Sequence, residues 1–222
     1  MLNSNKKIYT LGEEISNSIT HGIGSLLSIA ALVLMVIVAA SHKNAIGVVT
    51  SAIFGSSLII LYTMSTLYHA ISNEKAKKIF KIFDHVSIYW LIAGTYTPFT
   101  LVALRSINPA KAWTVFGIVW AIAIIGTITY AIFKNKFKIL NIVSYVIMGW
   151  VVIIALPEII EFFKINNAMP GLYLLAFGGI AYTFGIIFYV LQKKFKYSHS
   201  IWHLFVLLGS ILQFFSVILY VI

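Results

Sequence analysis

Residues 15–42 read ISNSITHGIGSLLSIAALVLMVIVAASH, a run of 28 positions without Asp, Glu, Lys or Arg. A transmembrane helix needs about 20 consecutive apolar residues, so this run is long enough to cross a bilayer. Six further uncharged runs of 19 to 30 positions follow it along the 222-residue chain. The sequence therefore predicts an all-α, polytopic membrane protein in which a single domain, 1–222, forms a seven-helix transmembrane bundle. The predicted spans are 15–41, 45–71, 84–104, 111–133, 139–160, 169–192 and 199–222.

The composition excludes several other classes of protein. The chain is 60% hydrophobic and 10% charged, whereas soluble domains are about half apolar and a quarter charged. A membrane β-barrel would show alternating segments of about ten residues, and a cleaved signal peptide has an apolar core of only about 7–15 residues. The sequence has no cysteine, which excludes disulfides and thiolate metal sites.

The positive charges predict the orientation of the bundle. Of the 16 Lys and Arg residues, 12 fall in the amino-terminal tail and in the second, fourth and sixth connectors. Cytoplasmic segments carry the excess of Lys and Arg, so we expect a cytoplasmic amino terminus and an external carboxyl terminus. Membrane topology thus explains the net charge of +10, and no nucleic-acid partner is predicted. The Lys75–Lys81 cluster is interpreted as a topology determinant that contacts anionic lipids.

Two prolines mark expected irregularities in the helices. Pro98 lies inside the third predicted span, where its missing N–H should kink the helix. The hydroxyls of Thr95 and Thr97 could then bond to carbonyls that the kink exposes. Pro157 is predicted to end the fifth span.

Histidines gather at one side of the predicted membrane. Five of the six fall at cytoplasmic ends of spans: His21, His69, His85, His199 and His203. His199 and His203 are four residues apart, so both rings project from one helix face and can bind the same ion. With His69 as a third imidazole and water as a fourth ligand, they would form an open zinc site of the catalytic type. The alternative is that these histidines are polar anchors at the membrane interface.

Other polar residues enter the membrane at the same depth. Asp84, the only Asp in the chain, could hold or deprotonate a zinc-bound water or orient a metal ligand. Its neighbour His85 is assigned to the side chains that support the metal ligands. Ser65 lies four residues before His69, on the same helix face.

Glu14, Asn17 and His21 recur on one face of the first helix, at relative positions 0, 3 and 7. One interpretation is that they line the metal cavity or hold the ligands in place. The alternative is that Glu14 offsets the positive end of the helix dipole, while Asn17 and His21 pack between helices.

The whole chain closely resembles the hemolysin III family, the bacterial members of the progestin and adiponectin receptor superfamily, which is related to the alkaline ceramidases. The resemblance rests on motifs in matching order: Glu14-x-x-Asn17-x-x-Thr20-His21, Ser65-x-x-x-His69, Asp84 leading to Gly94 and Pro98, and His199-x-x-x-His203. It implies a multi-pass protein of the bacterial plasma membrane, with zinc held by His69, His199 and His203 and Asp84 beside the zinc-bound water.

Three activities are compatible with these observations. The first is a zinc-dependent hydrolase of a membrane-lipid amide or ester, acting in lipid homeostasis, with Asp84 as base and Ser65 as hydrogen-bond donor to the oxyanion. The second is cytolysis through a pore, for which no predicted span carries a full-depth polar stripe. The third is a non-enzymatic sensor with structural zinc. Membrane lipids are the expected partners, and the oligomeric state is left open.

Overall fold

The computed structural model describes residues 9–222, except for the side chains of residues 135 and 138. Seven helices in this range are long and apolar enough to cross a membrane, which confirms the predicted all-α bundle. Lys6, Lys7 and the beginning of the 1–222 range lie outside the described residues. In chain order the elements are α1 (Leu11–Ser41), α2 (Ala45–Ala70), α3 (Glu74–Pro98), π-helix η1 (Phe99–Leu104), α4 (Arg105–Ile107), α5 (Pro109–Phe133), 3-10 helix η2 (Lys134–Phe137), α6 (Lys138–Trp150), 3-10 helix η3 (Val151–Ala155), α7 (Leu156–Ile165), α8 (Met169–Leu191) and α9 (Ser198–Tyr220).

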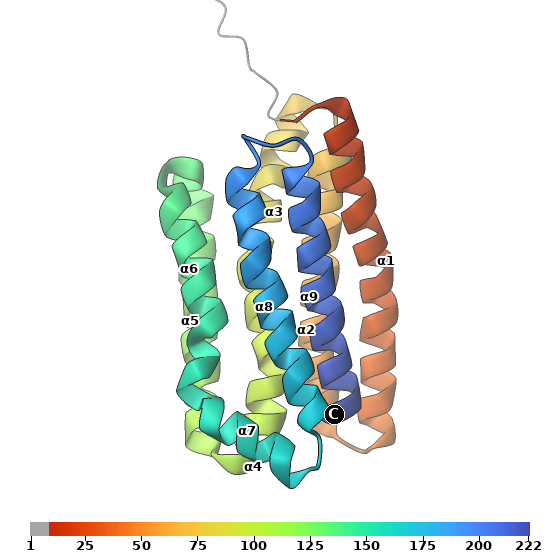
Figure 1. Ribbon diagram of the computed structural model, residues 1–222, viewed down its shortest axis with the longest axis vertical. Coiled ribbons are helices and arrows are strands. Elements are labelled where there is room, and N and C mark those ends of the chain that lie inside the picture. Colours follow the sequence, from red (N-terminus) through yellow and green to blue (C-terminus); the bar gives the residue numbers. More distant parts are fainter. Residues whose placement is uncertain (1–8) are drawn as a thin grey trace, which may run out of the picture.

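The long helices run side by side along one axis (Figure 1). Helix α1 begins at the top of the view, and the carboxyl terminus lies at the bottom. Helix α1 packs against α2 and α9, α2 packs against α3, and α8 packs against α9. We call the end where α1 begins the amino-terminal end of the bundle. Because α2 ends there and α3 and α9 begin there, residues far apart in the sequence meet at this end.

Asparagine and threonine side chains determine where helices begin. Thr10 and Glu13 form a capping box at the start of α1, in which each side chain bonds to the other residue's backbone N–H. Asn73 accepts hydrogen bonds from two backbone N–H groups and starts α3 at Glu74. The third span was predicted to start at residue 84, so the prediction was ten residues late. Charged side chains keep residues 74–83 out of an apolar run but do not prevent a helix.

The two prolines have different effects. Helix α3 continues past Pro98 as the π-helix η1, and Thr97 Oγ1 donates to the Ala93 carbonyl at 2.8 Å. The π-helix agrees with the predicted irregularity. The predicted role of the threonine hydroxyls is not seen, because the missing N–H of Pro98 frees the Gly94 carbonyl, whereas Thr97 bonds to Ala93 and Thr95 to Leu91. The prediction for Pro157 was wrong, because Pro157 lies in the first turn of α7, where a missing N–H removes no helical bond. The fifth span therefore runs on to Ile165.

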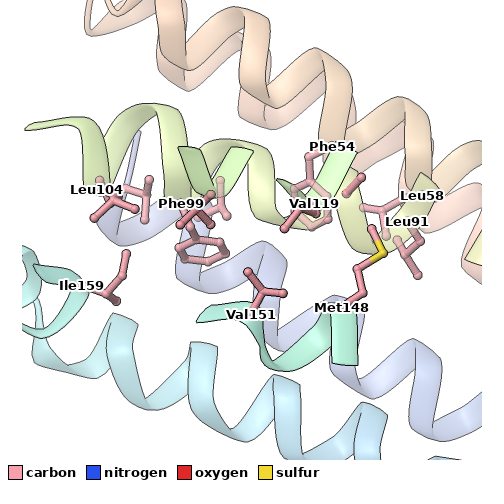
Figure 2. Packing of buried hydrophobic residues seen from close by; sticks show 14 of the residues in the cluster. Phe54, Leu58, Leu91, Phe99, Leu104, Val119, Met148, Val151 and Ile159 are labelled. Atoms are coloured by element: carbon pink, nitrogen blue, oxygen red, sulfur yellow. The ribbon is translucent and has the colours of Figure 1, made fainter. Parts of the chain in front are cut away.

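Apolar side chains fill the space between the helices (Figure 2). Phe54 of α2, Phe99 of η1 and Val119 of α5 are almost completely buried in this core. Many large apolar side chains point outward instead; Leu26, for example, is 71% exposed. An outward apolar surface is what a bilayer requires, so the fold is that of a multi-pass membrane protein.

Candidate metal centre

Three histidines meet at the amino-terminal end of the bundle. His69 comes from the last turn of α2, and His199 and His203 come from the first turns of α9. All three are buried, and one ring nitrogen of each lies within 4.8 Å of the others. Nitrogens bound to one zinc ion are at most about twice the 2.0–2.1 Å bond length apart, so a small side-chain adjustment would give shared coordination. Among the described residues, this is the only group of three or more candidate ligands. The donor set therefore fits a metal ion.

The contacts of His69 leave one ring nitrogen available to a metal. Its Nδ1 lies 2.6 Å from Glu14 Oε2, and Asn17 Nδ2 lies 3.4 Å away. Because the shorter contact is to a carboxylate, which accepts hydrogen bonds, Nδ1 carries the proton and donates it. His69 Nε2 is buried and has no hydrogen-bond partner among the described residues. Its lone pair is therefore free to bind a metal ion.

His203 is oriented by the same face of α1. Its Nδ1 lies 3.2 Å from the backbone carbonyl of Asn17, which can only accept a hydrogen bond, so Nε2 is left for a metal. Thr20 Oγ1 also lies 3.2 Å from His203 Nδ1. The side chain of Asn17 accepts a 2.6 Å hydrogen bond from Ser200 Oγ. One residue of α1 thus contacts ligand-bearing segments of both α2 and α9.

The other predicted supporting histidines lie on two sides of the cluster. The His21 ring stacks on His203, with ring centroids 3.5 Å apart and planes at 7°. His85 faces Asp84 instead, with His85 Nδ1 3.4 Å from Asp84 Oδ2. Its ring also stacks against Tyr130 at 5.1 Å. The structure therefore brings His21 into direct contact with a candidate ligand, and it places His85 against Asp84 and Tyr130.

An apolar cavity of about 440 Å³ opens beside the histidines. His199, His203 and Asp84 line one end of it, and Gln213 lines it ten residues further along α9. Its remaining walls come mainly from apolar residues of α3, α6, η3 and α8. A metal ion on the three histidines would therefore face a space that can hold a hydrocarbon chain.

The two predicted catalytic residues differ in their access to this cavity. Asp84 lines its wall, but its carboxylate is not part of the three-histidine group. Ser65 is fully buried, and its Oγ has no hydrogen-bond partner among the described residues. Although Ser65 precedes His69 by one turn, it is not among the described residues that line the cavity.

Two residues near the centre were missed by sequence reasoning. The Tyr9 ring packs 5.6 Å from His69 and 5.0 Å from His199, and its hydroxyl donates to Gln192 Oε1. Burial raises the pKa of that hydroxyl far above its ordinary value, so it remains a donor. Lys77 Nζ donates to Glu14 Oε1 at 2.6 Å, although its cluster was interpreted as a lipid contact. The capping residue Asn73 could have placed Lys77 on a helix, whereas no local pattern would have brought Tyr9 to the centre.

The chain has sequence relatives over nearly its whole length. The family described as "Haemolysin-III related" matches residues 9–214. "Hemolysin-3" of Bacillus cereus is 46% identical over 210 residues, covering 95% of this chain and 92% of the relative. The "Hemolysin-3 homolog" of Bacillus subtilis (strain 168) is 45% identical over 213 residues, covering 96% of each chain.

A more distant relative is the human "Monocyte to macrophage differentiation factor", which is 26% identical over 213 residues, covering 94% of this chain and 84% of the relative. No solved structure gives a significant match. The family match covers nearly all of the described residues and includes every motif on which the resemblance rests. The chain therefore belongs to the hemolysin III family, within the progestin and adiponectin receptor superfamily.

Proposed function

We propose that the protein is a zinc-dependent hydrolase that cleaves an amide or ester bond of a membrane lipid. The observation that carries the proposal is that two members of a buried three-histidine group, His199 and His203, line an apolar cavity together with Asp84. An acyl chain in the cavity would place its polar end, and hence its carbonyl, beside the histidines. Lipid homeostasis is the physiological role that such an activity would serve.

The residues at the centre have distinct roles in this proposal. His69, His199 and His203 would hold the ion. Glu14 orients the His69 ring and the Asn17 backbone carbonyl orients the His203 ring, each through the ring Nδ1. When bound, zinc would act as a Lewis acid toward the carbonyl oxygen and would lower the pKa of water toward neutrality. Asp84 accepts the proton released by the attacking water. Ser65 is given no role in this proposal, because it is not among the described residues that line the cavity and its Oγ has no hydrogen-bond partner among them.

We further propose that the amino-terminal end of the bundle faces the cytoplasm of a bacterial plasma membrane. The charge distribution supports this orientation, with 12 of the 16 Lys and Arg residues on that side. The candidate metal centre would then lie in the inner leaflet. Reporter enzymes that act only outside the cytoplasm should be active after Ile222 and silent in η2, and the reverse pattern would reject the orientation.

Lipid turnover by purified protein tests the hydrolase. The protein, reconstituted in liposomes, is incubated with a panel of ceramides, phospholipids and acyl esters while released fatty acid is measured. Turnover that stops on chelation and returns with zinc supports the proposal. Turnover that survives complete metal removal, or its absence across the panel with zinc bound, rejects it.

Membrane lysis is the second candidate, favoured by the name "Hemolysin-3" of the Bacillus cereus relative. The mostly apolar walls of the cavity disfavour a water-filled pore through one copy of the chain. Dye release from the same liposomes separates the two candidates. Leakage without lipid turnover favours lysis, and zinc binding without either activity favours a sensor.

A further inference from the structure

Gln213 of α9 places a buried amide in the wall of the cavity, within the membrane-spanning part of the bundle. The side chain is 3% exposed. Its Nε2 donates to the Leu175 carbonyl of α8 at 3.0 Å, while its Oε1 is buried without a hydrogen-bond partner among the described residues. A buried polar atom without a partner is costly in an apolar environment, so its position calls for an explanation.

The chemistry of this contact identifies which atom is free. The Leu175 carbonyl can only accept a hydrogen bond, so the amide atom that faces it must be the nitrogen. The group left over is therefore the carbonyl oxygen, an acceptor. Because the Gln213 side chain lines the cavity, an occupant that carries a donor, such as a hydroxyl, can bond to this oxygen once the amide turns toward it.

The other polar groups in this part of the cavity already have protein partners. Thr95 and Thr183 donate to the carbonyls of Leu91 and Gly179, one turn earlier in their own helices. The remaining hydroxyl contacts are Tyr96 to the Gly149 carbonyl and Tyr182 with Ser210. Among these polar atoms, Gln213 Oε1 is therefore the one that has no hydrogen-bond partner in the described part of the chain.

The distance between Gln213 and the candidate metal centre indicates where along its chain a ligand would carry the hydroxyl. Gln213 follows His203 by ten residues on α9, which is about 15 Å at 1.5 Å per residue. We propose that Gln213 Oε1 accepts a hydrogen bond from a hydroxyl on the lipid's acyl chain, so that the cavity selects mid-chain hydroxylated lipids. The inference deepens the proposed function and rests on it for the acyl chain in the cavity.

Competition binding tests the selection without requiring turnover. Wild-type protein in lipid nanodiscs is loaded with a fluorescent long-chain fatty acid, which is displaced by octadecanoic, 2-hydroxyoctadecanoic or 12-hydroxyoctadecanoic acid. The last of these carries its hydroxyl at about the required distance. We expect it to bind about 3- to 10-fold more tightly than octadecanoic acid, the usual effect of one net hydrogen bond. The 2-hydroxy acid should gain no such advantage.

Two variants locate the effect. Gln213→Met keeps an unbranched side chain but removes the acceptor, and it should abolish or reverse the preference. Thr183→Val, in the same cavity, should keep it because the Thr183 hydroxyl already bonds to Gly179. A preference that persists in Gln213→Met, or wild-type binding that ignores hydroxyl position, overturns the inference. The wild-type comparison decides the matter if Gln213→Met does not fold.

The outcomes also separate this inference from the hydrolase proposal. If none of the three acids displaces the fluorescent chain, the acyl cavity is wrong and both proposals fail. If all three bind equally well, only the role of Gln213 fails. If the hydroxyl preference is present but no lipid is hydrolysed, the binding site stands and the hydrolase is rejected.

Discussion

The two ends of the cavity differ in the kind of polar group that they contain. At the metal end, ionisable side chains bond across helices: His69 Nδ1 donates to Glu14, and His203 Nδ1 donates to the backbone carbonyl of Asn17. Towards Gln213, the polar side chains are hydroxyls and one amide, set in mainly apolar walls. Hydrogen bonds that involve an ionised partner are about twice as strong as those between neutral groups. The metal end is therefore suited to holding an ion, and the other end to an apolar chain with a single polar contact.

His203→Ala should have the largest effect, because it removes one of the three candidate ligands at the metal end of the cavity. We expect zinc to be lost, hydrolysis to disappear and the melting temperature to fall, since metal binding is coupled to folding. Metal analysis and thermal unfolding of purified protein measure these effects. His42→Ala, an exposed histidine at the opposite end of α1, is the control and should change none of them. Full zinc content in His203→Ala contradicts the three-histidine site.

Asp84→Asn should keep zinc but lower turnover by roughly 10²–10⁴-fold, the usual contribution of a positioned acid or base. Three imidazoles still hold the ion, whereas the amide cannot accept the proton. Metal content and lipid turnover are measured together, with Glu74→Gln at the exposed start of α3 as the control. Loss of zinc would make Asp84 a direct ligand, and unchanged turnover would remove it from the reaction.

Glu14→Gln should weaken zinc binding by roughly 10–100-fold, because a neutral amide replaces the carboxylate that orients His69. Zinc affinity is measured by competition with a chelating dye. Glu161→Gln, which is exposed at the other end of the bundle, should have no effect. Unchanged affinity in Glu14→Gln would show that the contact between α1 and α2 does not position the ligand.

Gly179→Leu tests the other end of the comparison and should have the smallest effect. Gly179 lines the cavity, and an added Cβ would meet no atom within 4 Å, so the larger side chain extends into open space. We expect acyl-chain affinity to fall by about 3- to 10-fold while zinc affinity is unchanged. Gly117→Leu on α5 has the same open surroundings but lies outside the cavity lining, so it should bind like wild type. Altered zinc binding in Gly179→Leu would show that the two ends are coupled.

The sequence predicted the spans well because charged side chains rarely enter hydrocarbon, so their spacing marks the membrane. It did not predict where helices extend beyond the uncharged runs, as the start of α3 at Glu74 shows. There the capping ability of Asn73, rather than hydropathy, determines the boundary. A search for capping residues would have corrected the prediction.

The sequence predicted those parts of the candidate metal centre that lie close together on one helix. Helical periodicity alone places His199 and His203 on one face, and the depth of His69 in the membrane identified the third histidine. The contacts of Tyr9 and Lys77 join elements distant in the sequence, so no spacing rule indicated them. Gln213 gave no signal because its significance depends on the Leu175 carbonyl of a neighbouring helix.

The ligands' positions along the chain have a consequence for biosynthesis. His69 enters the membrane with α2, and about 130 residues must be translated before His199 follows. At about 5–20 residues per second, His69 waits roughly 7–26 s for its partner ligands. Glu14 belongs to the preceding helix and is present throughout that interval. A nascent chain can therefore form the contact between His69 and Glu14 early, but it can complete the metal site only when its last helix has been inserted.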